Sequence, residues 1–88
     1  MKTKKGYVLR PLGTEYILVA EGLEAVDANR IISMNESASY LWKAVEGKDF
    51  EAETLADLLL EEYEIAREVA ETDSAVLLQT WKDAGIVE

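Results

Sequence analysis

The sequence contains neither cysteine nor histidine. Without cysteine there is no disulfide framework, and no thiolate can hold a metal ion. Without histidine, the side chain that most often acts as a base near neutral pH is missing as well. No glycine-rich loop opens a helical segment in the manner of a phosphate site. We therefore expect a protein that is not an enzyme and that uses no metal and no cofactor.

Basic residues are also scarce, since nine of them face eighteen acidic residues and the formal net charge is −9. From Glu46 to Asp73 there are eleven acidic residues but only Lys48 and Arg67 as bases. A surface this negative repels phosphate backbones and anionic lipid headgroups, so we expect no nucleic-acid partner and no membrane partner. A solvated, solubilising face is the plainer interpretation of such a charge run.

Long apolar runs are absent too. None approaches the roughly 18 residues that cross a bilayer, and the first lysines are not followed by the apolar core of a signal peptide. We expect a cytoplasmic protein. Its 88 residues fit one domain, which we place over residues 1–88.

The first third of the chain predicts strands. Residues 7–10 and 15–20 are rich in β-branched and aromatic side chains, and residues 11–14 between them include the sole proline and a glycine, as a turn prefers. A third strand is expected over residues 30–34. Strands that follow one another this closely favour an antiparallel meander.

A helical period begins after that third strand. Asn35 is predicted to cap the first helix with its side chain, and Glu36 adds negative charge to the first turn. A second helix is expected from about Glu51, and a third from about Ala66 to Ala84, ended by Gly85. The fold class is thus α+β, three antiparallel strands followed by three helices. The side chains expected on the buried face of the third helix are Val69, Ala70, Val76, Leu77, Thr80, Trp81 and Ala84.

Two residues of the third helix stand out. Leu78 falls at the edge of the apolar sector beside Ser74 and Trp81, where it is either a binding residue or a singly exposed leucine. Asp73 falls inside that sector, where an unpaired carboxylate is costly. We expect a structural role for Asp73, with Arg30 or backbone amides near the first helix as its partner.

The residues also carry a family resemblance. The sequence resembles the PqqD family of coenzyme PQQ synthesis proteins in five stretches, taken in order: Gly6 to Arg10, Glu15 to Val19, Ile31 to Trp42, Leu55 to Tyr63, and Asp73 with Leu77 to Val87. Met34 and Ser37 depart mildly from the family pattern. The resemblance implies a winged helix-turn-helix-like domain that binds the leader segment of a ribosomally made precursor peptide. It also implies a partner that modifies the peptide, often a radical SAM enzyme.

The open edge of a third strand is independently suited to this role, because its unpaired backbone groups can pair with an extended peptide. We expect the peptide between the third strand and the third helix. The peptide-binding residues expected there are Arg30, Ile31, Ile32, Ser33, Ser74, Leu77, Leu78, Trp81 and Lys82, with Asn35 and Asp73 as structural residues.

Two other functions remain open at this point. A DNA-binding winged helix-turn-helix regulator would read the major groove with a helix. The third helix has Arg67 and Lys82 against Glu68, Glu71, Asp73 and Asp83, which is unfavourable for DNA. A general protein-interaction domain would use the same groove for a different partner.

Overall fold

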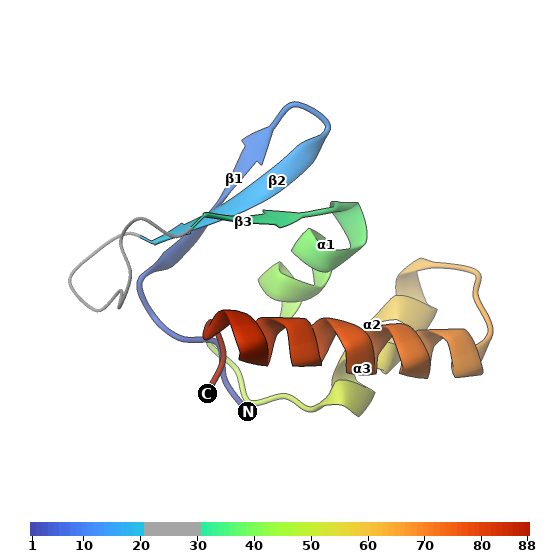
Figure 1. Cartoon of the computed structure of the whole chain (residues 1–88). Coiled ribbons are helices and arrows are strands. Elements are labelled where there is room, and N and C mark those ends of the chain that lie inside the picture. The colour runs from blue at the N-terminus through green and yellow to red at the C-terminus, as the bar shows by residue number, and fades with distance from the viewer. Residues whose placement is uncertain (21–30) are drawn as a thin grey trace.

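The computed structural model describes residues 1–20 and 31–88. Three strands precede three helices along the chain, which confirms the α+β class and the order of elements expected from the sequence. The elements, drawn in Figure 1, are β1 (Tyr7–Leu12), β2 (Glu15–Ala20), β3 (Ile31–Met34), α1 (Glu36–Val45), α2 (Ala52–Glu62) and α3 (Arg67–Ala84).

The sheet is an antiparallel meander in the order β1-β2-β3. Its first turn is tighter than expected, because Pro11 and Leu12 belong to β1 and only Gly13 and Thr14 lie outside the strands. Proline is tolerated there because β1 is an edge strand. Gly13 has a φ of 64°, a conformation that two-residue hairpin turns require and that glycine adopts without strain. The opposite edge of the sheet is β3, which pairs with no other described strand on its outer side.

The corner between β3 and α1 is built as the sequence predicts. Asn35 has extended backbone angles, and its Oδ1 accepts from the backbone N–H of Ala38 at 2.8 Å. The same oxygen accepts from the Ser37 hydroxyl at 3.1 Å. These bonds satisfy a backbone donor that the helix itself leaves unpaired. Asn35 is therefore the N-cap of α1, and its structural role is confirmed.

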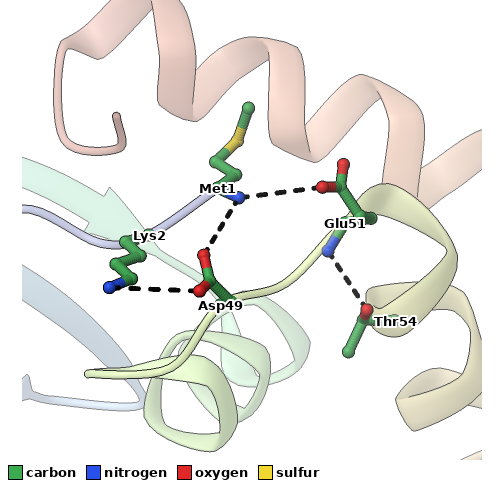
Figure 2. A network of polar contacts seen from close by, with 5 residues as sticks. All are labelled: Met1, Lys2, Asp49, Glu51 and Thr54. Carbon is green, nitrogen blue, oxygen red and sulfur yellow. Dashed lines mark hydrogen bonds and ion pairs between the residues drawn. The ribbon is translucent and has the colours of Figure 1, made fainter.

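A polar network near the N-terminus fixes the start of α2 (Figure 2). The Met1 ammonium lies 3.5 Å from Asp49 and 3.7 Å from Glu51, and the Glu51 backbone N–H donates to the Thr54 hydroxyl at 3.1 Å. Glu51 is the N-cap of α2, and its backbone N–H is thus satisfied by the residue three positions later. The first described residues also pair with the last ones, since an isolated bridge joins Thr3 to Val87.

The core lies between the sheet and the helices. Trp42 of α1 and Trp81 of α3 pack edge to face with ring centroids 5.3 Å apart, and Phe50 packs against Trp81 at 6.2 Å. The indole N–H of Trp42 donates to Glu46 at 2.9 Å, so this buried donor is satisfied. Leu18 of β2 has no exposed surface and joins the sheet to this cluster.

The buried face of α3 differs from the expected one. Ala70, Ser74, Leu78 and Trp81 are its buried residues, whereas Val69 and Val76 are 46% and 62% exposed. The helix carries two apolar stripes, and the sequence favoured the one with the β-branched residues because Ser74 interrupts the other. The assignment of Val69, Val76 and Thr80 to the core was therefore wrong, because these three residues are exposed. Leu77 is half-buried and packs against the edge of the core. Val76, Leu77 and Thr80 form part of a groove.

Candidate functional site

A groove of about 560 Å³ runs between β3 and α3. In the view of Figure 1, α3 passes below β3 and runs in the opposite direction. Most of the groove-lining side chains are apolar. The lining residues are Ile32, Ser33, Met34, Asn35, Ser37, Ala38, Leu41, Leu59, Tyr63, Ile65, Asp73, Val76, Leu77, Thr80 and Trp81.

The floor of the groove belongs to the hydrophobic core. Met34, Leu41, Leu59 and Trp81 are each at least 94% buried, and they come from one strand and all three helices. Because the rigid core holds these side chains, the floor is already formed before anything binds. A preformed apolar floor is the usual basis of a binding pocket.

The strand wall of the groove follows from the alternation of β3. Ile32 and Met34 share the face of the sheet that carries the buried Leu18, because Leu18 pairs with Ile32 in register. Ser33 between them is exposed. Every second residue of an edge strand also directs its N–H and C=O away from its neighbour in the sheet. The β3 edge therefore offers both backbone groups and two apolar side chains to the groove.

The helix wall is one stripe of α3. Asp73, Val76, Leu77 and Thr80 recur at intervals of three or four residues, so they lie on one face of the helix, and Trp81 adjoins them. Leu77 is half-buried, and Val76 is largely exposed. This stripe faces β3 across the groove.

The residues expected to bind a peptide are only partly brought together. Ile32, Ser33, Leu77 and Trp81 line the groove. Ile31 belongs to β3. Lys82 is exposed but does not line the groove. Arg30 lies outside the described residues.

The expectation for Ser74 and Leu78 was wrong. Ser74 has no exposed surface and Leu78 is only 6% exposed, because both point into the core rather than the groove. The reason is the rotation of the α3 face described above. A peptide in the groove would meet Leu77 instead of its neighbour Leu78.

The expectation for Asp73 was wrong in the same way. Its side chain is exposed and lines the groove, so it is not a buried polar residue of the core. The proposed partnership with Arg30 falls outside the described residues. Among the described residues, the backbone amide of Ala38 at the start of α1 bonds to Asn35 instead of Asp73.

Several groove residues were not anticipated from the sequence, among them Tyr63, Ile65, Val76 and Thr80. A signal for them existed. Tyr63 and Ile65 are apolar residues in the short link after α2, where exposed loops are usually polar. Val76 belongs to the second apolar stripe of α3. A chain of this size has no second core that could bury this stripe.

Two tyrosines mark one side of the groove. Tyr63 lines it, and the ring of Tyr40 packs edge to face on Tyr63 with centroids 6.4 Å apart. Burial raises the pKa of both phenols above the ordinary value of 10.0, and nearby carboxylates add to the effect. For Tyr40 these are Glu62 and Glu61, and for Tyr63 they are Glu36 and Glu62. Both tyrosines therefore stay neutral hydrogen-bonding groups at physiological pH.

The residues over 1–20 and 31–88 bring no three metal-ligating side chains together, and none of their helices could cross a membrane. The apolar lining and the adjoining edge of β3 give the groove the chemistry of a site for an extended chain. The polar side-chain groups of its described lining residues are hydroxyls, one amide, one carboxylate and the indole N–H of Trp81.

Comparison with known structures supports the fold. One similar chain was solved as TbiB1 in complex with the TbiA(beta) leader peptide, with a TM-score of 0.75 and 21% identity, covering 100% of this chain and 95% of that chain. Another is lasso peptide synthetase B1 complexed with the leader peptide, with a TM-score of 0.72 and 20% identity, covering 99% of this chain and 95% of that chain. No curated protein matches the sequence significantly.

A family model also matches the sequence directly. It is described as coenzyme PQQ synthesis protein D (PqqD), and it matches residues 7–87. This range includes every strand and helix of the structure. The resemblance noted from the sequence is confirmed, and the chain belongs to the PqqD family.

Proposed function

We propose that this protein is a non-catalytic recognition domain that binds the leader segment of a ribosomally made precursor peptide. The leader would add as a strand to the outer edge of β3 and place alternate side chains in the groove between β3 and α3. We also propose that the complex is formed in the cytoplasm and is presented there to an enzyme that modifies the peptide. The class of enzyme implied by the family resemblance is a radical SAM enzyme.

The observation that carries this proposal is the juxtaposition of the β3 edge with an apolar groove. A strand added beside β3 would lie about 4.8 Å from it. Side chains of that strand on the same face as Ile32 and Met34 would then point toward Leu77 and Trp81. Backbone pairing would supply affinity for extended peptides in general, and the groove would supply the preference for particular side chains.

The comparisons support the same function. Two chains with this fold were solved with a leader peptide bound, and the family is one of coenzyme synthesis proteins. The charge of α3 argues against the DNA-binding alternative. Arg67, one of its two bases, already lies 3.4 Å from Asp57 and 3.8 Å from Glu71. A helix that reads DNA needs free positive charge on its exposed face.

The proposal is tested with synthetic leader segments of short peptides encoded beside the gene for this protein. In an NMR titration, the largest amide shift changes are expected in residues 31–34 and 73–81. The exposed outer face of α2, with Asp57 and Glu61, serves as the internal control. Changes centred on α2, or no binding by any such segment, would count against strand addition in this groove.

The role in presentation needs a separate measurement. A radical SAM enzyme encoded in the same neighbourhood should bind the protein, and modification of the full precursor should slow when the protein is left out. A general interaction domain would bind neither the enzyme nor the precursor. Equal rates with and without the protein would refute presentation while leaving peptide binding intact.

A further inference from the structure

Of the described residues that line the groove, Asp73 is the only one with a charged side chain. It comes from the helix wall, one turn before Val76 and Leu77, and its side chain is exposed. An exposed carboxylate beside apolar side chains keeps its hydration while the groove is empty. A peptide that covers the groove would remove part of that water, so the carboxylate would then need a new partner.

Three other polar side chains of the groove already form hydrogen bonds within the fold. Asn35 Oδ1 accepts hydrogen bonds from Ala38 and Ser37, at 2.8 and 3.1 Å. The hydroxyl of Thr80 donates to the backbone carbonyl of Val76 at 2.9 Å. Asp73 has no comparable bond among the described residues. Its carboxylate is therefore the group in the groove with the most capacity left for a ligand.

Within residues 1–20 and 31–88, no ion pair neutralises Asp73. Arg67, the nearest base along α3, is occupied by Asp57 and Glu71. Lys43 lies over the ring of Tyr16, 5.4 Å from its centroid. The chain as a whole carries a net charge of −9. A cationic peptide side chain would be attracted by this field, and an anionic one would be repelled.

We infer that Asp73 selects a lysine or arginine in the bound peptide, and this inference rests on the proposed function. Asp73 lies in the N-terminal half of α3, and because α3 runs opposite to β3 in Figure 1, this half lies toward the end of the strand that leads into α1. Trp81 and Thr80 lie more than a turn further along the helix. The preferred ligand is thus an extended segment with bulky apolar residues on alternate positions and a cation near the end that meets Asp73. Asp73 is a specificity-determining residue.

The inference is tested by selecting from a display library of random dodecapeptides on the wild-type protein, Asp73→Asn and Asp73→Lys. Asp83→Lys is the matched control, because it makes the same change in charge on an exposed α3 residue that does not line the groove. Circular dichroism and thermal melting establish that each variant is folded. A peptide synthesised from the wild-type selection is then titrated against every variant.

Peptides selected on the wild-type protein should be enriched in lysine or arginine at one fixed position. Peptides selected on Asp73→Lys should instead be enriched in glutamate or aspartate at that position. Asp83→Lys should keep the wild-type preference. The wild-type peptide should bind Asp73→Asn about fivefold more weakly, with less dependence on salt.

The outcomes separate the two claims. The role of Asp73 would be overturned if the peptides selected on the wild-type protein compete for the groove but show no preferred cation. It would also be overturned if the peptides selected on Asp73→Lys still prefer a cation at the same position. Either result leaves the proposed function intact. If no peptide is selected, or if every selected peptide binds Leu77→Glu as tightly as the wild-type protein, the proposed function is overturned, and the role of Asp73 with it.

Discussion

Leu77 and Leu78 are adjacent in α3 but belong to different parts of the molecule. Leu77 is half-buried and lines the groove, whereas Leu78 is 6% exposed and packs in the core. Successive helical residues differ by about 100° around the axis, which is enough to separate the two environments. Substitutions at these two neighbouring positions therefore test binding and folding separately.

Leu77→Glu should leave the protein folded and weaken peptide binding at least tenfold, or about 1.4 kcal/mol. A carboxylate in the groove removes apolar contact and must be desolvated when the peptide binds. Titration of a peptide selected on the wild-type protein measures the effect. Val69→Glu is the control, since Val69 is 46% exposed on the same helix and does not line the groove. Equal losses for both variants would show that the groove is not the site.

Leu78→Ala should destabilise the fold by about 2–4 kcal/mol, through lost burial and the cavity left behind. Chemical denaturation with the wild-type protein as reference measures this. Peptide affinity of the fraction that remains folded should stay close to that of the wild type. A stable Leu78→Ala variant with impaired binding would return Leu78 to the groove and contradict the observed face of α3.

The corner between β3 and α1 could be predicted because its interactions are local. Asn35 bonds to residues only two and three positions away, so the sequence alone specifies the cap. The rotation of α3 could not be predicted in this way. Two apolar stripes compete on that helix, and packing against α2 and Trp42 decides between them. The open edge of β3 could be predicted from the order of the strands. The position of Asp73 in the groove could not, because it depends on the rotation of α3 about its axis.

Asn35→Ala should lower the free energy of unfolding by about 1 kcal/mol, because the Ala38 amide loses its partner. Asn35→Asp is the matched control. It keeps an acceptor oxygen and adds negative charge at the helix N-terminus, so it should be at least as stable as the wild type. Denaturant titration of the three proteins gives the comparison. If Asn35→Ala were as stable as the wild type, the cap would make no net contribution to the free energy of unfolding.

Stability should fall in alkaline solution as Tyr40 and Tyr63 ionise. Burial raises the pKa of each phenol above 10.0, and carboxylates such as Glu62 add to it, so the folded state binds the phenolic protons more tightly than the unfolded state. This contribution is complete below pH 10 and is lost as the pH rises through the folded-state pKa. Melting temperatures measured from neutral pH to above 10 should fall less steeply for the double variant Tyr40→Phe, Tyr63→Phe. Parallel curves for the two proteins would exclude the tyrosines as the cause.

Ser74→Ala should stabilise the protein. The Ser74 hydroxyl oxygen is buried in the core and has no hydrogen-bond partner among the described residues, so folding removes its water without replacement. Alanine has nearly the same size and a higher helix propensity, and the free energy of unfolding should rise by about 0.5–1.5 kcal/mol. Ser33→Ala is the control, since Ser33 is exposed on β3 and its hydroxyl stays hydrated. Denaturant unfolding of both variants measures the difference. A loss of stability in Ser74→Ala alone would mean that the hydroxyl is hydrogen-bonded in solution, as a serine in a helix can be to the carbonyl one turn earlier.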